Sequence, residues 1–562
     1  MSDSIALRGS AFHPADGARA GHRRLRKLTD EELQSDAGVT LLLRERPAGP
    51  TTAQTLAWLQ SLPDGRSRQM DLNQLTARHG YHPADRDRVV RWATAAGLQV
   101  TFENAATRRV MVRGSTALLA TVFGVDLERF RWQQPDGRTV EYRGHLGPIH
   151  LPPPLHGVID GVFGLDDRPI ARSHVRSLAD GREAIFAYDP PQIAALYDYP
   201  RLPNGGEGLE LVAAMIELGG VVHPFDLAAS FARLGLRAPD ITNVWIDGAT
   251  PTPDPVGADV EVALDYQVIG AMVAAMAPKA HLTIVNYNAP NSERGFIDAV
   301  ATAAGDAARH PAAVSISWGS PEDHWSPQGV RGLDSAFATG ALHGVTFSAA
   351  AGDAGSSNDE LDGLQHPEFP ASSPHVWACG GTTLLAARGR IRTETVWNEI
   401  ARGAGAAGSG VSGAFPVPAY QAALGIRPRS ADSGAPGRGL PDGSGNADPL
   451  TGWNVVALRR LRSTGGTSAV APMYTALWTL VSAQLGHRIG LPHPTLYAHR
   501  GRGFNDVTAG DTGGPYAARR GWDLASGWGS PDGRQIARDL GARLPAQETR
   551  ARRIAGGERE IA

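Results

Sequence analysis

The residues best suited to chemistry lie in the segment Gly465–Pro472, which places a serine at the predicted start of a helix. Gly465 and Gly466 allow a sharp turn and let a substrate approach the backbone closely. Ser468 then lies beside the unpaired N–H groups of the first helical turn, which can stabilise an oxyanion. Because a hydroxyl alone is a weak nucleophile, the segment predicts a nucleophilic serine that needs a base from elsewhere in the chain.

Histidine is the first candidate for that base, since a Gly-Thr-Ser segment at a helix start also occurs in subtilisin-like proteases. The histidine of those enzymes lies in a His-Gly-Thr-His helix start, and none of the 18 histidines here has that context. The nearest match, His343-Gly344, leads into a predicted strand. A neutral, subtilisin-type peptidase with a histidine base stays open as an alternative.

A pair of carboxylates is the second candidate. The segment 259–272 has helical spacing, which puts Glu261 and Asp265 one turn apart on the same face. Partial burial of like charges raises the pKa of one or both, so the two groups should titrate as a coupled pair. A glutamate can accept a proton at mildly acidic pH, where a histidine is already charged. The pair favours acid catalysis, although on its own it would fit a solvated helix face.

The elements that must position these residues are short apolar runs alternating with helical windows beyond Tyr188. This pattern predicts an α/β fold with a mostly parallel sheet covered by helices on both faces. Active sites of such sheets lie at the carboxyl ends of the strands, where this chain has Glu217, Trp318 and Asp353. Two stretches rich in Gly, Ala, Ser and Pro, 401–414 and 430–449, predict long surface loops.

Composition limits the classes of protein that fit. A length of 562 residues with 42% hydrophobic residues predicts two domains plus tails. A net charge of −3 does not support nucleic-acid binding, and the basic run 22–27 is interpreted as a solvated terminal segment. The single cysteine, Cys379, allows no intramolecular disulfide and is interpreted as a buried structural thiol. No apolar run reaches membrane-spanning length, and the first residues lack the build of a signal peptide.

We predict five parts along the chain. They are an N-terminal tail (1–27), a compact α+β unit (28–165), a linker (166–187), an α/β domain (188–545) and a charged C-terminal tail (546–562). The linker is rich in Arg, Asp and Ser and has little periodicity. It therefore predicts an exposed segment of the kind that proteases cut.

An ordered set of short motifs resembles the sedolisin family of serine-carboxyl peptidases, and in particular its kumamolisin-like members. The motifs are Ile216–Gly220, Ser315–Gly319, Ala349–Gly355, Phe369–Pro374, Val396–Glu399, Gly410–Ser412 and Gly521–Asp523, together with the segments around Ser468 and Glu261. Each motif is weak alone, but the ordered set is specific and covers nearly the whole chain. The resemblance implies a subtilisin-like α/β domain preceded by an α+β activation prodomain.

The resemblance also implies a role for each candidate residue. Ser468 would be the nucleophile, Glu261 the base and then the acid to the leaving amine, and Asp265 the residue that orients Glu261. Asp353 would stabilise the oxyanion, for which it must be protonated, and low pH or a raised pKa supplies that proton.

Glu217 and Trp318 match positions that extend the hydrogen-bond chain behind the acidic pair in kumamolisin-like members. Without the resemblance, Trp318 fits a core aromatic at a strand end equally well.

A single structural calcium ion is implied near the C-terminus. The matching residues are Asp506 and Asp523 through their carboxylates, with Val507, Arg519 and Gly521 through their carbonyls, and such hard oxygen ligands suit Ca²⁺. The family commonly has glycine where Arg519 falls, but a carbonyl ligand survives a change of side chain. Without the resemblance, both aspartates would fit ordinary turns.

The expected protein is an acid-acting serine-carboxyl endopeptidase made as a self-activating zymogen. Its partners would be protein or peptide substrates and its own prodomain as intramolecular inhibitor, with no nucleic acid or membrane, and it would work as a monomer outside the cell. A catalytically silent peptide-binding relative is the other alternative. The intact set of Ser468, Glu261, Asp265 and Asp353 argues against silence.

Overall fold

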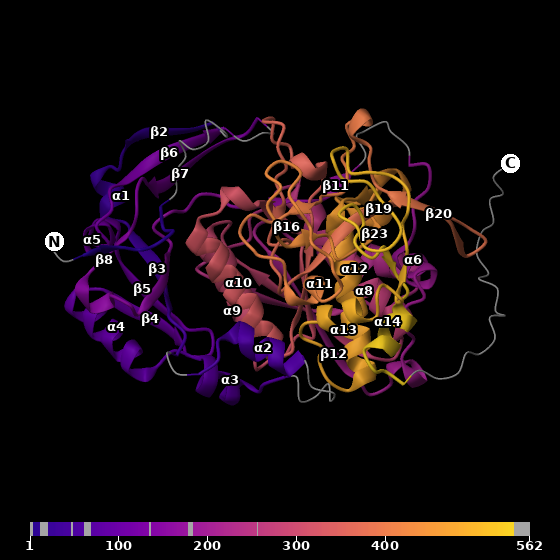
Figure 1. Ribbon diagram of the computed structural model, residues 1–562, viewed down its shortest axis with the longest axis horizontal. Helices are drawn as coiled ribbons and strands as arrows, with labels where there is room; N and C mark the ends of the chain where they lie inside the picture. The colour runs from indigo at the N-terminus through magenta and orange to yellow at the C-terminus, as the bar shows by residue number, and fades with distance from the viewer. Residues whose placement is uncertain are drawn as a thin grey trace.

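A computed structural model describes residues 4–543 of the chain, apart from 12–20, 47–48, 61–68, 134–136, 178–183 and 256. An N-terminal unit and a larger unit that begins near Tyr188 lie side by side (Figure 1). The predicted tail 546–562 lies outside the described residues. Within them, no helix is long and apolar enough to cross a membrane.

The larger unit is built on an eight-stranded sheet. Its strand order is β13-β14-β12-β15-β17-β19-β20, with β23 paired to β19, and every pair is parallel except β19 with β20. The strands are β12 (Glu210–Glu217), β13 (Asp240–Trp245), β14 (His281–Asn288), β15 (Ala313–Ile316), β17 (Thr346–Ala350), β19 (Trp377–Ala387), β20 (Arg390–Val396) and β23 (Gly443–Asn446). The prediction of a mostly parallel sheet is confirmed.

Helices α8 (Ala258–Met276) and α12 (Thr467–Leu485) cover one face of this sheet, and α9 (Glu293–Ala304) and α10 (Pro327–Leu342) cover the other. The unit also has α6 (Pro190–Leu196), α7 (Pro224–Leu234), α11 (Ala419–Ala422), α13 (His493–Ala498) and α14 (Gly533–Asp539). In β12, Ala213 and Met215 join the core formed with α8 and α12, whereas Ala214 and Ile216 join the core formed with α9 and α10. Successive strand residues point to opposite faces, which explains why the strands are apolar throughout.

The two glycine-rich stretches are only in part the surface loops that composition predicts, since residues 401–405, 413–414 and 430–436 are exposed or half-buried. Residues 406–412 and 437–449 are almost entirely buried, and they form β21 (Gly410–Val411), β22 (Gly439–Leu440) and β23. A Cβ on Gly443 would lie 2.6 Å from the Tyr474 hydroxyl, and one on Gly445 would lie 2.6 Å from Met473 Cε. Glycine is needed in β23 because α12 packs directly on the backbone there.

The N-terminal unit has two antiparallel sheets, β4-β5-β3-β9 and β2-β6-β7. Its strands are β2 (His22–Lys27), β3 (Asp36–Leu43), β4 (Gln99–Asn104), β5 (Arg109–Ser115), β6 (Leu127–Gln133), β7 (Thr139–His145) and β9 (Ile159–Phe163), with the short pair β1 (Ile5–Ala6) and β8 (His150–Leu151). Its helices are α1 (Asp30–Gln34), α2 (Thr52–Gln60), α3 (Leu72–His79), α4 (Pro83–Ala95) and α5 (Thr116–Val122). Residues 22–27 therefore form a strand of this unit rather than part of a tail, although their side chains are largely exposed.

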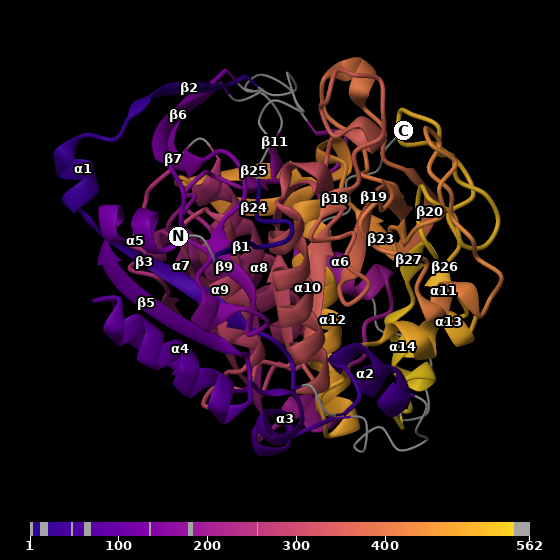
Figure 2. The same ribbon diagram turned by 60° about the vertical axis from the view of Figure 1, so that its left-hand side comes forward.

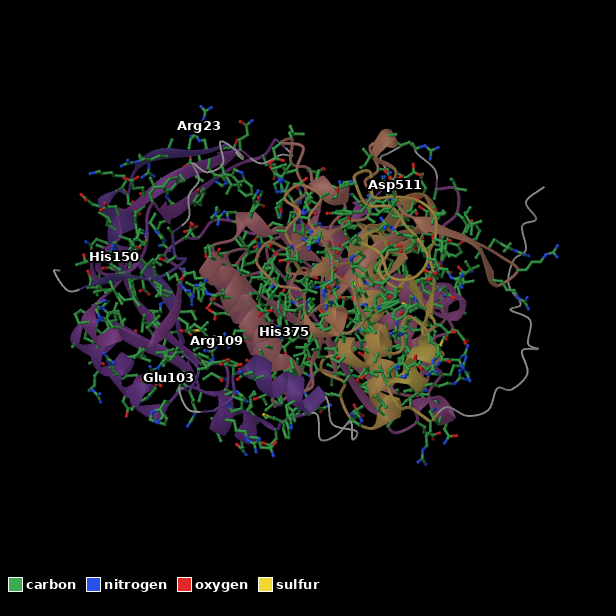
Figure 3. All side chains as sticks on the ribbon, in the orientation of Figure 1. Arg23, Glu103, Arg109, His150, His375 and Asp511 are labelled. Atoms are coloured by element: carbon green, nitrogen blue, oxygen red, sulfur yellow. The ribbon has the colours of Figure 1, made fainter. Side chains whose placement is uncertain are left out.

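The two units share a buried boundary. Strand β9 and helix α2 contact α10, and Leu42 and Phe163 join the core of α9 and α10. Arg109 of β5 and Asp298 of α9 form an ion pair of 2.8 Å with side chains that are 1% and 0% exposed. Figure 3 labels Arg109 where the N-terminal unit meets α9 and α10. The Thr40 hydroxyl donates to the same carboxylate at 2.5 Å.

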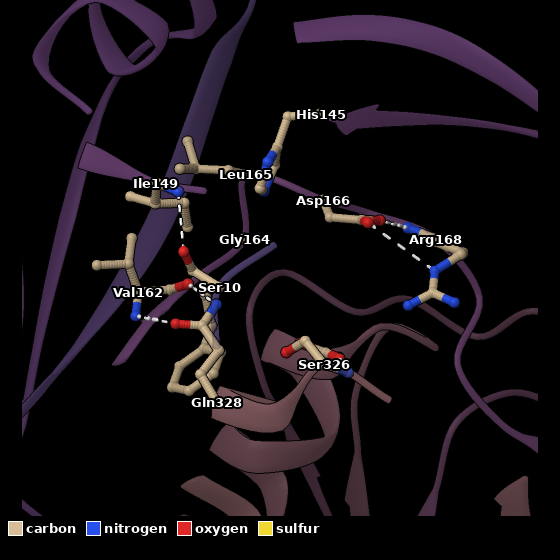
Figure 4. A pocket seen from close by; sticks show the side chains of 12 residues that line it. Ser10, His145, Ile149, Val162, Gly164, Leu165, Asp166, Arg168, Ser326 and Gln328 are labelled. Carbon is tan, nitrogen blue, oxygen red and sulfur yellow. Dashed lines mark hydrogen bonds and ion pairs between the residues drawn. The ribbon is translucent and has the colours of Figure 1, made fainter. Parts of the chain in front are cut away.

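A small polar cavity also lies at this boundary (Figure 4). Its lining includes His145, Asp166 and Arg168, and none of the candidate catalytic residues lines it. Beside it, the Gln328 side chain accepts from the backbone N–H of Val162 and donates to the Val162 carbonyl. The cavity thus belongs to the boundary between the units.

Arg109→Ala should weaken the attachment of the N-terminal unit. The change removes the closer of the two cations beside the buried Asp298 carboxylate, since Arg294 Nε still lies 3.5 Å from its other oxygen. The loss should therefore stay below the roughly 3–5 kcal/mol that breaking a lone buried pair costs. Trypsin should cut residues 166–187 faster at neutral pH, measured in a Ser468→Ala background. The control is Arg113→Ala on the same strand, where Arg113 pairs with Asp36 at the surface and a loss below about 1 kcal/mol is expected. Equal cutting rates for the two variants would contradict the prediction.

Candidate active site

Ser468 is the second residue of α12, directly after the turn at Gly466. Gly466 has a φ of +91°, and a Cβ added there would collide with oxygen atoms of neighbouring segments, so only glycine fits. Pro472 has no N–H group, so the Ser468 carbonyl lacks its usual helical donor, and the Ser317 hydroxyl oxygen lies 3.3 Å from it. Gly466 thus permits the loop turn before the helix, and Pro472 determines the hydrogen bonding in the first turn of α12.

The side chain beside Ser468 is the carboxylate of Glu261. Ser468 Oγ donates a hydrogen bond of 2.7 Å to Glu261 Oε2. Asp265, one turn further along α8, accepts from Ser317 Oγ at 2.9 Å. Both carboxyl groups are fully buried, because α8 is enclosed by α7 and α12. The interpretation as a solvated helix face is therefore wrong.

No histidine among the described residues hydrogen-bonds to Ser468. The only other oxygen near its hydroxyl in hydrogen-bond range, within that part of the chain, is the Ser317 carbonyl at 3.4 Å. His343 is buried at the end of α10, where its Nδ1 lies 2.9 Å from the Ala304 carbonyl. The geometry therefore offers Ser468 a carboxylate as its base.

A third buried carboxyl group, that of Glu217, lies behind the pair. Trp318 Nε1 donates to Glu217 Oε2 at 2.8 Å. Burial, and then repulsion by neighbouring carboxyl groups, raises the pKa of Glu217 and of Glu261. Burial also raises the pKa of Asp265 to about 7. The three groups cannot all be ionised, so the cluster retains protons at acidic pH.

Asp353 follows the carboxyl end of β17 and is buried against the N-terminus of α12. Its Oδ1 accepts from the Thr467 backbone N–H at 2.7 Å and from the Thr467 hydroxyl at 2.8 Å. Its Oδ2 makes no hydrogen bond and lies 3.5 Å from Nε of Arg176. Burial raises the pKa of Asp353, and the Arg176 guanidinium opposes that rise.

The described part of the linker runs through this site. β10 (Arg172–Ser173) pairs with β16 (Trp318–Pro321), and β11 (Arg176–Ser177) pairs with β25 (Arg460–Gly465). Figure 2 shows β11 beside β25 and β24 (Trp453–Ala457). The prediction of an exposed linker is wrong for residues 172–177, because groups of the catalytic domain bind its polar side chains. Residues 178–183 of the linker lie outside the described residues, and beyond them Ile185 and Phe186 are exposed as predicted.

Two linker residues contact the candidate catalytic groups directly. The Ser173 hydroxyl donates to Glu261 Oε2 at 2.7 Å, the same oxygen that Ser468 uses. The backbone N–H of His174 donates to the Ser317 carbonyl at 3.1 Å. A Cβ on Gly466 would collide with both the His174 carbonyl oxygen and Asp353 Oδ2. These two oxygens therefore converge at the start of α12, beside Ser468.

The His174 side chain fills a buried pocket. Its Nε2 lies 2.7 Å from Glu368 Oε1, and both side chains are almost fully buried. Asn358 donates to the other Glu368 oxygen. Burial on its own would raise the pKa of Glu368, but the His174 imidazole, together with Arg172 and Asn358, outweighs burial and lowers the pKa below its ordinary value.

The implied calcium set comes together at one loop. Asp506 accepts from the Gly521 N–H with both oxygens, at 3.2 and 3.0 Å, and Asp523 Oδ2 accepts from the Arg519 N–H at 2.7 Å. The Val507 carbonyl accepts from a serine hydroxyl at 3.3 Å. No group of three or more His, Cys, Asp or Glu side chains suited to a metal ion occurs in the described residues. The donors fit calcium by their oxygen chemistry, but such a site would depend on backbone carbonyls.

Several residues of the site are missed by reasoning from the sequence. Ser317 lies inside the motif Ser315–Gly319 and Thr467 directly precedes Ser468, so the sequence pattern could have indicated both residues. Ser173, His174 and Glu368 carried none, because the contacts of the linker join residues 88 and 194 positions apart.

The hydrogen bond between Ser468 and Glu261 is the geometry expected of a serine peptidase in which a carboxylate replaces the histidine base. The family model "Pro-kumamolisin, activation domain" matches residues 29–168. Kumamolisin from Bacillus sp. (strain MN-32) is 40% identical over 524 residues, which cover 90% of this chain and 92% of that protein. The chain belongs to the sedolisin family of serine-carboxyl peptidases and carries an N-terminal activation prodomain.

Two further comparisons agree. Tripeptidyl-peptidase sed5 from Aspergillus fumigatus is 27% identical over 598 residues, covering 94% of this chain and 97% of that protein. The solved structure of Pseudomonas sedolisin, a serine-carboxyl proteinase complexed with pseudo-iodotyrostatin, is 29% identical with a TM-score of 0.55. It covers 64% of this chain and 98% of that one.

Proposed function

We propose that the chain is an acid-acting endopeptidase on a subtilisin-like domain, made as a zymogen that first cuts its own bond between His174 and Val175. The supporting observation is the place of the His174 carbonyl oxygen, which lies with the unpartnered oxygen of Asp353 against Gly466, two residues before Ser468. The linker is hydrogen-bonded to the catalytic domain on both sides of this carbonyl, at β16 and at β25. A peptide held this way has its reacting carbonyl aligned in advance.

The positions of Ser468, Glu261 and Asp353 allow hydrolysis of the peptide bond in two steps through an ester on Ser468. Ser468 Oγ attacks the carbonyl carbon while Glu261 accepts the hydroxyl proton, and the oxyanion forms toward Asp353, whose carboxylic O–H donates to it. Glu261 then returns the proton to the leaving amine, and the C–N bond breaks to give an ester on Ser468. Water attacks this ester with Glu261 again as base, which releases the new carboxyl end.

The two members of the acidic pair take different roles because of their hydrogen bonds. Hydroxyls of Ser468 and Ser173 both donate to Glu261 Oε2, which favours the charge on Glu261. Glu261 Oε1 and Asp265 Oδ2 have no partner among the described residues. A proton carried by Asp265 and shared with Glu261 would satisfy both oxygens. Asp265 would thus hold Glu261 in position as a charged base.

Arg176 would keep the zymogen inactive at neutral pH. Its guanidinium lies beside Asp353 and favours the ionised carboxylate. An ionised Asp353 repels an oxyanion and has no proton to donate. Acidification protonates Asp353 and so completes the site while the linker is still in place.

An endopeptidase, rather than an enzyme that removes tripeptides, is supported by the path of the linker. The segment is paired with the catalytic domain on both sides of the candidate scissile bond. The chain also continues in both directions, so the cleft accepts a peptide without a free end. The family resemblance further supports a monomer that works outside the cell.

The zymogen proposal is tested by incubating the full-length protein at about pH 4, near the ordinary carboxyl pKa. The first new N-terminus should be Val175, identified by N-terminal sequencing, and the Ser468→Ala variant should stay intact. A first cut at another bond would overturn the assignment of the scissile bond. Equal processing of the Ala variant would overturn self-cleavage.

Calcium binding by Asp506, Asp523 and the carbonyls of Val507, Arg519 and Gly521 is part of the proposal. The ion would neutralise two carboxylates and hold the loop, which is a structural role. A ligand that binds only the folded state stabilises by about 2.7 kcal/mol at 100 times its Kd. The melting temperature should therefore rise with CaCl₂ and fall with a chelator.

Asp506→Asn should lose most of this calcium-dependent rise. Asp511→Asn is the control, since Asp511 lies in the same region but accepts from Asn398 and the Gly513 N–H instead. The same melting temperature of the wild type in calcium and in chelator would reject the calcium site. In that case the amide hydrogen bonds alone hold the loop.

A further inference from the structure

The segment 358–366, which precedes β18 (Glu368–Phe369), contacts the linker, and the mechanism above does not use it. Its first two residues, Asn358 and Asp359, have left-handed backbone φ values of +54° and +66°. Asn and Asp are the non-glycine residues that adopt this conformation most readily. Asn358 is buried, whereas the Asp359 side chain is 46% exposed. The turn thus presents a buried amide and a half-exposed carboxylate to the bound peptide.

Arg172 of β10 is the linker side chain that this turn holds most closely. Its Nη2 donates to the Asn358 backbone carbonyl at 2.9 Å and to Asn358 Oδ1 at 2.6 Å. Its Nη1 lies 3.2 Å from Asp359 Oδ2. A planar guanidinium can serve several acceptors in this way, whereas the compact ammonium of lysine cannot. The three oxygens therefore form a binding site for an arginine side chain.

The catalytic domain holds this site in place. Asn358 Nδ2 donates to the His366 backbone carbonyl at 3.2 Å and to the Glu368 carboxylate, which orients the amide so that its oxygen faces the linker. The buried His366 imidazole lies 3.0 Å from Asp323 and 3.0 Å from Asp362. All of these partners belong to the catalytic domain, so the arrangement does not depend on the linker.

The position of the site relative to the candidate scissile bond is defined by the linker. Arg172 is the third residue before the His174–Val175 bond, on the side where β10 pairs with β16. Arg176, on the other side, lies farther from Asp359, at 3.9 Å, and its closer contact is the Asp353 carbonyl at 3.3 Å. No other cation in the described part of the chain lies within ion-pair distance of Asp359. Departure of the linker therefore leaves the carboxylate available to an arginine of another peptide.

We propose that Asn358 and Asp359 form a specificity site of the mature enzyme, which selects peptides with an arginine three residues before the bond that is cut. This inference rests on the proposed function, because it takes the linker as the first substrate and its path as the path of later substrates. Asp359 supplies the charge, and the two oxygens of Asn358 fix the guanidinium plane. The contact lies away from the reacting atoms, so it should lower KM more than it raises kcat.

The test is a double-mutant cycle between the mature enzyme and a synthetic peptide of residues 169–177. The wild type should cut this peptide about 10-fold better in kcat/KM than its Arg172→Gln version, because charge-assisted hydrogen bonds are lost. In the Asp359→Asn enzyme this preference should shrink by about two- to fivefold, the range of an exposed ion pair. The assays are run at about pH 5, where exposed carboxyl groups are largely ionised.

The matched enzyme control is Glu360→Gln. Glu360 is the next residue of the same segment, but its carboxylate lies 3.2 Å from His324 Nε2 instead of beside the linker. This variant loses the same charge as Asp359→Asn, yet it should keep the wild-type preference. The matched peptide control is Arg176→Gln, whose effect should differ by less than about twofold between the wild type and Asp359→Asn, because that ion pair is longer.

Three results would overturn the inference while leaving the proposed function in place. They are equal wild-type rates on the Arg and Gln peptides, an unchanged preference in Asp359→Asn, and an equal loss of preference in Glu360→Gln. The first of these needs no enzyme variant, so it decides the matter even if Asp359→Asn does not fold. Failure of the mature wild type to cut the unmodified peptide in acid, or a cut at a bond other than His174–Val175, would instead overturn the proposed function or its scissile bond.

Discussion

Glu261→Gln should reduce kcat by about 10³-fold or more, with little change in KM. Glutamine keeps the shape of the side chain and can still accept the Ser468 hydrogen bond of 2.7 Å, but it cannot take the proton. General acid–base catalysis contributes about 10²–10⁴-fold, and a residue that serves as both base and acid falls at the upper end. The measurement is steady-state kinetics on a peptide substrate with protein processed in trans, since the variant should not process itself.

The control for this variant is Glu394→Gln. Glu394 is another fully buried glutamate that accepts hydroxyl groups, from Tyr197, Thr382 and Ser530, but it lies away from Ser468. Its replacement should lower the melting temperature and leave kcat within a few-fold. If Glu261→Gln kept more than a tenth of the wild-type kcat, Glu261 would not be the base.

Asp353→Ala should reduce kcat by about 10²–10³-fold, the usual effect of losing one donor to an oxyanion. Its Oδ1 is held by Thr467, which leaves Oδ2 to face the reacting carbonyl. KM should change little, because the donor acts on charge that exists only in the transition state. The kcat on a peptide substrate and the rate of self-processing should fall together in this variant.

Asp226→Ala is the comparison for Asp353→Ala. Asp226 is buried and accepts two backbone N–H groups, those of Leu458 and Arg459, at a distance from the site. Its loss should cost stability and leave kcat near the wild-type value. A similar loss of kcat in both variants would mean that Asp353 acts only through the fold.

Much of the candidate site can be predicted from the sequence because its parts have local signals. The i, i+4 spacing of Glu261 and Asp265 on an apolar helix is such a signal, and α8 places both carboxyls beside Ser468. The glycine turn before Ser468 and the strand before Asp353 are others. Each depends on residues that are neighbours in the chain.

Contacts between distant segments could not be predicted in the same way. The linker has a polar composition that is typical of solvated segments, yet Ser173 and His174 are bound by Glu261 and Glu368. Their polar groups are satisfied by a cleft that exists only after the sheet has formed. The prediction of surface loops was wrong for residues 437–449 for a related reason, because in β23 glycine serves close packing against α12 rather than loop flexibility.

The pH dependence of kcat/KM tests the carboxylate base most directly. Activity requires one charge on the Glu261–Asp265 pair, so it falls as pH drops below the lower of the two pKa values of the pair, where the pair gains a second proton. It also requires a protonated Asp353, so it falls as pH rises through the pKa of Asp353, which burial raises above its usual value. We expect a bell-shaped profile with its maximum in the acid range and little activity above neutrality. A maximum at or above pH 7, reached through a single rising limb near the ordinary pKa of histidine at about 6.5, would contradict the account.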